Sequence, residues 1–148
     1  TFETEPGVNG LFRFTRFLAH LRQRHESLQQ KQYGDLVPDD RDVSYLFHTP
    51  SMEGYPQDGD RALSVYINSP GDNFLMMVNM ADTEVTFNAP TPAEGRVWRR
   101  LIDTGVWAEP ADNSWPEGEG MVLDGATQVQ PWSVVVWHDS PTLADDAG

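Results

Sequence analysis

Two groups of aspartates carry side chains that could take part in acid–base chemistry or bind calcium. One group is Asp39, Asp40 and Asp42, and the other is Asp58 and Asp60. Catalytic carboxylate pairs usually sit on rigid elements beside an apolar wall, which separates their pKa values. Both groups here stand in polar stretches rich in turn residues, and the second lacks the ligand spacing and closing glutamate of a calcium loop. We therefore interpret both as solvated turns.

The four histidines offer no recognisable catalytic or metal-binding pattern. His20 and His25 are five residues apart, so they do not share a helix face as an i, i+4 metal pair would. His25 is expected to pack on the apolar side of a helix, and His48 and His138 stand at the ends of predicted strands without an evident partner. No serine fits a nucleophile elbow, and the chain has no cysteine. The sequence therefore predicts no catalytic residue, no metal ligand and no cofactor site.

One long amphipathic helix, from about Asn9 to Lys31, is predicted near the start of the chain. Asn9 is suited to cap it, because its side chain can accept from free backbone N–H groups, and Gly34 is suited to end it. At about 100° per residue, one face of this helix is apolar. That face carries Leu11, Phe14, Leu18, Leu21, His25 and Leu28, with Phe17 at its edge.

Phe12 and Ala19 fall outside that face and form a second, smaller apolar patch. A helix that only covers a β-sheet needs one apolar face, whereas a helix with two is typical of a position between two neighbours. We therefore expect residues 1–34 to be a lead-in and the last helix of a larger domain that lies upstream.

After the helix, short strand patterns alternate with turn residues. Six strands are predicted, at residues 43–48, 62–68, 74–80, 84–89, 96–103 and 133–138, with a long loop at 105–120. The segment 74–80 is apolar on both faces, so we expect it at the centre of a sheet. The pattern favours a mainly β class, an antiparallel Greek-key β-sandwich of about six to eight strands over residues 35–139. Residues 140–148 are expected to be a flexible tail.

The charge of the chain disfavours polyanionic partners. The net charge is −13, and it is unevenly spread, with +2 over residues 1–33 and −15 over residues 34–148. An acidic body repels phosphate groups, so nucleic acids and anionic membranes are not expected as partners, whereas a neutral polymer is not repelled. No apolar stretch approaches the ~20 residues that a membrane helix needs. With no cysteine and no signal-peptide pattern, a cytoplasmic location is expected.

The run from Leu11 to His25 (LFRFTRFLAHLRQRH) resembles the last barrel helix of isoamylase-type, glycogen-debranching members of the α-amylase superfamily. Further blocks resemble that family in the same order, over about residues 9–138. They are Asp42–Tyr45 (DVSY), Gly54–Gln57 (GYPQ), Arg61–Ser64 (RALS), Leu75–Met80 (LMMVNM), Trp98–Thr104 (WRRLIDT) and Ser133–Val136 (SVVV). The chain departs from the family pattern at Glu26, where proline is usual, and at Tyr45, where tryptophan is common. Tyr55 opens a Tyr-Pro-Gln segment where the family commonly has an Asp-Trp pair.

The resemblance implies a parent enzyme that hydrolyses α-1,6 branch linkages of glycogen-like or starch-like glucans. Its three catalytic carboxylates would lie in a barrel outside this chain, because such a barrel needs about 250 residues. The chain itself is then expected to be a non-catalytic C-terminal β-sandwich that packs against the missing barrel of the same polypeptide.

Aromatic side chains in loops are the remaining candidates for ligand contact. Trp107, Trp115 and Tyr55 could stack on sugar rings through their apolar faces. The alternative is that these rings cover the sandwich edge or pack on the helix.

Two other interpretations remain open. The chain could be a stand-alone carbohydrate-binding module, or a β-sandwich from another protein that serves protein interaction. The helix discriminates between these interpretations and the barrel, because full burial of its apolar face within this chain would remove the main support for the barrel.

Overall fold

The computed structural model describes residues 8–29, 43–69 and 71–143. Helix α1 (Val8–Arg24) comes first, and a short 3-10 turn, η1 (Glu26–Leu28), follows it. The predicted helix was longer, since His25 already has an extended backbone with φ −120° and ψ 107°. Asn9 lies within the first turn of α1 and is therefore not its cap. Lys31 and Gly34 lie outside the described residues, as do Asp39, Asp40 and Asp42.

Within the described ranges, seven antiparallel strands form two sheets, so the predicted mainly β class with one N-terminal helix is confirmed. The strands are β1 (Ser44–His48), β2 (Ala62–Asn68), β3 (Phe74–Asn79), β4 (Val85–Asn88), β5 (Arg96–Asp103), β6 (Ala126–Val129) and β7 (Ser133–Pro141). The larger sheet has the order β1-β2-β3-β7-β5, and β4 pairs with β6 in the smaller one.

The sequence predicted Greek-key links between the strands. In the structure, the connections from β3 to β7 cross from one sheet to the other. β1, β2 and β3 are joined in sequence, after which the chain leaves the large sheet for β4 and again for β6. The last strand, β7, then inserts between β3 and β5 and pairs with both. This places the apolar strands β3 and β7 at the interior of the sheet, as expected for strands with two covered faces.

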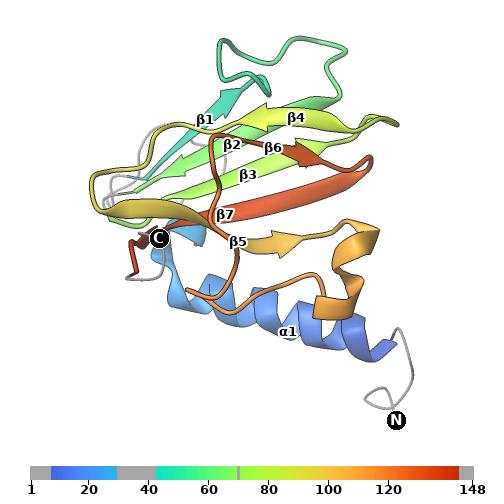
Figure 1. Cartoon of the computed structure of the whole chain (residues 1–148), viewed down its shortest axis with the longest axis vertical. Helices are drawn as coiled ribbons and strands as arrows, with labels where there is room; N and C mark the ends of the chain where they lie inside the picture. The colour runs from blue at the N-terminus through green and yellow to red at the C-terminus, as the bar shows by residue number, and fades with distance from the viewer. Residues whose placement is uncertain (1–7, 30–42, 70, 144–148) are drawn as a thin grey trace.

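Each face of the large sheet is covered by a different element (Figure 1). Alternation along β3 turns Phe74 toward one face and Leu75 toward the other. The face that carries Phe74 packs against α1 through Leu21, and the face that carries Leu75 packs against β4 and β6 through Phe87 and Val129. The sequence therefore builds two cores on a single sheet.

The C-terminal boundary differs from the prediction. β7 runs to Pro141, and the backbone N–H of Thr142 donates to the carbonyl of Gly95 over 2.9 Å. The predicted flexible tail from residue 140 therefore begins too early, while residues 144–148 lie outside the described part. A 3-10 helix, η2 (Val106–Ala111), occupies the start of the predicted loop at 105–120. Among the described residues, no helix has the length and apolar character needed to cross a membrane.

Candidate functional site

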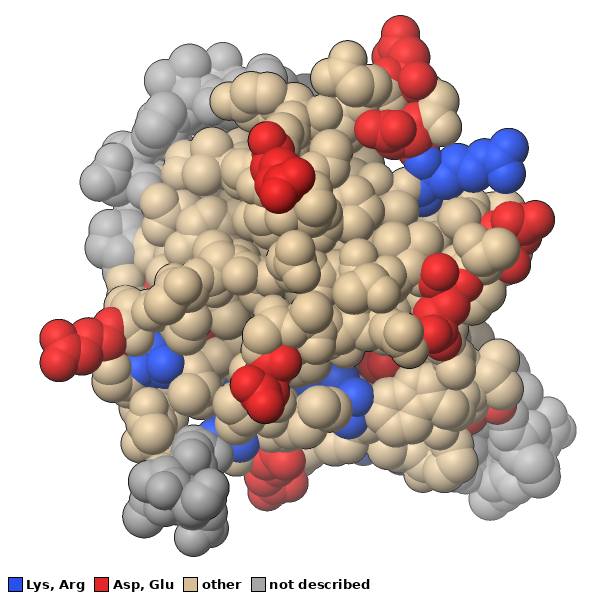
Figure 2. Space-filling view, turned by 45° about the horizontal axis from the view of Figure 1, so that its top comes forward, with Lys and Arg blue, Asp and Glu red and all other residues tan. Residues whose placement is uncertain are grey.

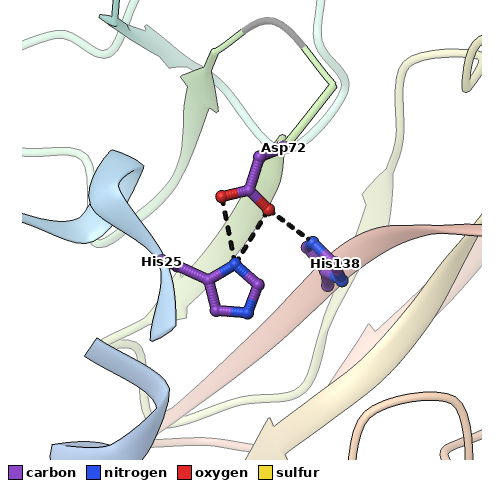
Figure 3. A group of neighbouring side chains, drawn as sticks. All are labelled: His25, Asp72 and His138. Carbon is purple, nitrogen blue, oxygen red and sulfur yellow. Dashed lines mark hydrogen bonds and ion pairs between the residues drawn. The ribbon is translucent and has the colours of Figure 1, made fainter. Parts of the chain in front are cut away.

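A cluster of two imidazoles and one carboxylate lies where the end of the helical segment meets the sheet (Figure 3). His25 comes from the extended residue between α1 and η1, and His138 comes from the helix-facing side of β7. Asp72 stands in the turn between β2 and β3, where Gly71 has a φ of 72° that suits glycine. Three segments distant in the sequence thus bring their polar atoms to one place.

Asp72 is the centre of the cluster. Its Oδ1 lies 2.9 Å from His25 Nδ1 and 2.8 Å from His138 Nε2. The hydroxyl of Ser27 donates to its other oxygen over 2.9 Å. The rings pack closely as well, since the His25 and His138 centroids are 5.0 Å apart and Phe74 contacts both. The two imidazoles therefore contact the apolar ring of Phe74 as well as the carboxylate of Asp72 between them.

His25 is hydrogen-bonded to a carboxylate at each ring nitrogen. Its Nδ1 faces Asp72, and its Nε2 contacts Glu117 Oε1. A neutral imidazole can donate from only one nitrogen, so hydrogen bonds to two carboxylates require the imidazolium form. The hydrogen bond to Asp72 raises the pKa of His25, and it outweighs the opposing desolvation with help from Glu117.

The two carboxylates respond in the opposite direction. Burial alone would raise the pKa of Asp72, but hydrogen bonds from His138, His25 and Ser27 outweigh it and hold that pKa well below its usual range. Burial also opposes the shift at Glu117, whose pKa is lowered by the hydrogen bond and charge of His25 and by Arg24. Arg24 Nε donates to Glu117 over 2.9 Å, which fixes this carboxylate beside the helix end.

The cluster can hold protons or a cation, but it is not arranged for nucleophilic catalysis. Ser140 Oγ lies 3.3 Å from His138 Nδ1, so a Ser–His–Asp sequence of contacts exists. The Ser140 residue is only 6% exposed, however, and a substrate could not reach its hydroxyl. The hydroxyl of Ser27 is hydrogen-bonded to the Asp72 carboxylate and not to an imidazole. Neither serine therefore has an accessible hydroxyl activated by a histidine.

Two interpretations of the histidines need correction. His138 was expected at a strand end without a partner, yet β7 continues three residues beyond it and its Nε2 contacts Asp72. His25 was expected on the apolar face of a helix, yet it lies after the helix and binds two acids. Arg22 and Arg24 in the last turn of α1 are a signal for the helix end that the prediction did not use.

The loop aromatics do not gather in one place. Trp107 and Trp115 stack with centroids 5.9 Å apart, and the Arg100 guanidinium lies 4.6 Å and 4.0 Å from their centroids. Trp107 Nε1 also donates to Asp103 over 3.0 Å. Tyr55 is 74% exposed and belongs to the loop between β1 and β2. That loop lies at the opposite end of the molecule from the segment 106–111 (Figure 1). Trp107 and Trp115 therefore form one pair, apart from Tyr55.

The second aspartate group lies in the same β1–β2 loop as Tyr55. Asp58 and Asp60 are exposed, and Asp60 Oδ2 accepts from the backbone N–H of Gln57 over 2.8 Å. Gly59, between them, has a φ of 93°. This is a turn stabilised by its own side chain, in line with the interpretation from sequence.

The comparisons with known proteins give one family and one fold. Residues 49–137 match the family described as isoamylase, C-terminal. No curated protein matches the chain.

Solved structures of the trehalulose synthase MutB, an enzyme from Pseudomonas mesoacidophila MX-45, share the fold. An inactive double mutant in complex with isomaltulose has a TM-score of 0.52 at 16% identity, over 87% of this chain and 18% of that one. A mutant from crystals soaked with trehalulose has a TM-score of 0.50 at 16% identity, over 86% of this chain and 17% of that one. This chain thus spans less than a fifth of the length of either protein.

The family match covers more than half of the chain, and it includes the strands from β2 to most of β7. The resemblance seen in the ordered strand blocks is therefore confirmed, and this chain belongs to the isoamylase C-terminal family.

Proposed function

We propose that this chain is the non-catalytic C-terminal domain of a debranching glycoside hydrolase, and that it packs through α1 against the catalytic barrel of the same polypeptide. The parent enzyme would hydrolyse α-1,6 branch linkages of glycogen-like or starch-like glucans. The family match supports the proposal that this chain is a C-terminal domain. The resemblance of the α1 sequence to the last barrel helix of debranching enzymes supports the proposal that the parent is a debranching enzyme. A cytoplasmic location belongs to the same proposal and rests on the lack of cysteine.

The outer surface of α1 is the observation that carries this proposal. Leu11 is 67% exposed, Phe12 43% and Leu18 37%, although Leu21 on the same helix is only 3% exposed. A helix that needed only to cover the sheet would place its large apolar side chains against the sheet. Leu11 and Leu18 were expected on one apolar face with Leu21, but they are exposed, as is Phe12 of the smaller patch. These uncovered side chains support a second neighbour for the helix.

The charge distribution agrees with a neutral substrate. Acidic side chains are scattered over the face seen in Figure 2, with few basic ones among them. Such a surface disfavours nucleic acids and anionic membranes and leaves a neutral glucan free to approach. The same acidity does not hinder packing on a barrel through α1, whose own charged residues are largely arginines.

Charge substitutions on α1 test the barrel contact. Leu11→Glu with Leu18→Glu is expected to leave the thermal unfolding of the 148-residue chain within a few tenths of a kcal/mol of wild type, because both residues are exposed. In a longer polypeptide that includes the upstream region, the same pair is expected to destabilise the barrel and reduce hydrolysis of pullulan. Leu46→Glu, at a 41% exposed leucine on β1, is the matched control. Equal effects of both changes in the long polypeptide would contradict the proposal.

A secondary glucan contact at Trp107 is part of the proposal. Trp107 is 47% exposed, and its ring is held by Asp103, Arg100 and Trp115, so the exposed part of the ring is available to a sugar without reordering. Titration of maltooligosaccharide into the chain should change tryptophan fluorescence, and Trp107→Ala should remove the change while Trp132→Ala keeps it. An unchanged signal at millimolar sugar would exclude this contact.

A further inference from the structure

We propose that His25, Asp72 and His138 form a binding site for one divalent transition-metal ion, with Zn²⁺ the best match. Each residue offers one ligand atom, and these atoms all lie within 4.8 Å of one another. The residues come from the end of α1, the β2–β3 turn and β7, so a shared ion would link the helix to the sheet (Figure 3). This inference does not depend on the proposed parent activity.

The spacing of the ligand atoms is close to what a metal ion requires. The nitrogen–oxygen distances around Asp72 are now 2.8–3.0 Å, which suits direct hydrogen bonds. Around a tetrahedral Zn²⁺, with bonds of about 2.0–2.2 Å, neighbouring ligand atoms lie about 3.3 Å apart. The nitrogen–oxygen contacts must therefore lengthen by a few tenths of an ångström. The two imidazole nitrogens, which lie within 4.8 Å of each other, must take up the same separation of about 3.3 Å. A proton that joins His25 to Asp72 would leave to solvent as the ion enters.

Each ligand already has the outer partner that a metal site needs. Metal-bound imidazoles donate their second N–H to a carboxylate, carbonyl or hydroxyl group, which orients the ring. His25 Nε2 faces Glu117, so its Nδ1 is left for the ion. His138 Nδ1 faces Ser140 Oγ, so its Nε2 is left for the ion, and the free oxygen of Asp72 accepts from Ser27. Both imidazoles can thus be neutral ligands with fixed tautomers.

The donor set and its exposure favour zinc over the harder cations. Two imidazole nitrogens and one carboxylate oxygen suit Zn²⁺, whereas Ca²⁺ and Mg²⁺ prefer sites made of oxygen. The side chains of His25 and His138 are 12% and 11% exposed, and that of Asp72 is 27% exposed. Three protein ligands on a partly solvent-exposed site leave a fourth coordination position for water. Glu117, a carboxylate that does not bind the ion itself, offsets part of the charge of the ion.

The site can be tested by isothermal titration calorimetry of the metal-free chain with Zn²⁺. Visible absorption spectroscopy with Co²⁺, a spectroscopic substitute for Zn²⁺, is the second test. We expect one ion to bind per chain with a submillimolar Kd or lower. The Co²⁺ complex should show the visible absorption bands of low-symmetry coordination, and the bound ion should raise the Tm of the chain. Asp72→Asn keeps the shape of the side chain and should weaken binding at least tenfold. His138→Ala should do the same, and Glu117→Gln should weaken binding about tenfold as an outer partner. His20→Ala removes an exposed histidine of α1 and is expected to bind like wild type.

The results separate a metal site from a cluster of ion pairs alone. A wild-type chain that binds neither Zn²⁺ nor Co²⁺ at submillimolar concentration would overturn the proposal. Binding that survives both Asp72→Asn and His138→Ala would overturn it too, since the ion would then sit elsewhere. Circular dichroism of every variant shows whether it is folded. If His138→Ala does not fold, the isosteric Asp72→Asn decides the outcome by itself.

Discussion

The two faces of the five-stranded sheet are covered in different ways, although the same strands supply both. Toward β4 and β6 the core is closed, and Leu75, Phe87 and Trp137 are each at most 1% exposed. Toward α1 the core is less complete, because Phe14 and Phe17 are only partly buried and Leu11 and Leu18 face outward. The ionisable cluster of His25, Asp72 and His138 lies on this second side only.

The difference indicates separate tasks for the two faces. A closed apolar core gives stability that does not depend on a partner. The other face is covered by one helix, and charged groups in the first half and in the last turn of that helix attach it to the rest of the chain. Arg13 with Asp112 holds the first half of α1, and Arg24 with Glu117 holds its last turn. In the proposed parent enzyme, the helix would be a connecting layer between the sheet and the barrel.

The largest effect is expected on the closed face. Trp137→Ala removes a ring that is 1% exposed and packed on Met77, and it should cost about 3–5 kcal/mol of unfolding free energy because the strands around it cannot collapse fully. Trp132→Ala, at a ring that is 64% exposed, is the control and should change stability by about 0.5 kcal/mol or less. Urea denaturation of both variants measures this. Similar losses for the two would contradict a core centred on Trp137.

A smaller effect is expected on the helix face. Leu21→Ala should cost about 2–3 kcal/mol, at the low end for a buried leucine, because a partly open neighbourhood relaxes into the space left behind. Leu18→Ala, three residues earlier and 37% exposed, should cost less than about 1 kcal/mol. The same denaturation measurement applies. A larger loss for Leu21→Ala than for Trp137→Ala would reverse the comparison of the two faces.

The local sequence predicted most of the strands, because a strand with one buried face shows an alternation of apolar and polar residues. The predicted strands at 62–68 and 96–103 coincide with β2 and β5, and turn residues bound both. The four-residue β6 was not located, since its sequence ATQV has a single buried residue, Val129. Short edge pairs of this kind depend on the partner strand, which is not visible in the local sequence.

The histidine cluster could not be predicted from spacing, because its contacts are far apart in the chain. His25 meets Asp72 across 47 residues and Glu117 across 92 residues. Helical periodicity assigned His25 to the apolar face, and the tertiary contacts with these two acids accompany a break in the helix at that position. Motif rules for histidine pairs describe one helix at a time, so they do not cover a site assembled from a helix end, a turn and a strand.

The smallest effect is expected at the ion pair that attaches the first half of α1. Arg13 donates to Asp112 from two nitrogens, and the hydrogen bond lowers the pKa of Asp112 below its ordinary value. The folded chain therefore binds this proton less readily than the unfolded chain. The stabilisation by the pair is complete above the ordinary pKa of an aspartate, about 3.9, and disappears as the pH falls through the lowered value.

Asp112→Asn tests this attachment. The Tm difference between wild type and the variant should be small, because the side chains of Arg13 and Asp112 are 41% and 29% exposed and salt screens such pairs. It should be constant near neutral pH and shrink below about pH 4. Asp58→Asn, at an exposed carboxylate in the β1–β2 loop, is the control. A difference that grows on acidification would mean that Asp112 is protonated more easily in the folded chain, and that the helix is held at this end by its apolar contacts alone.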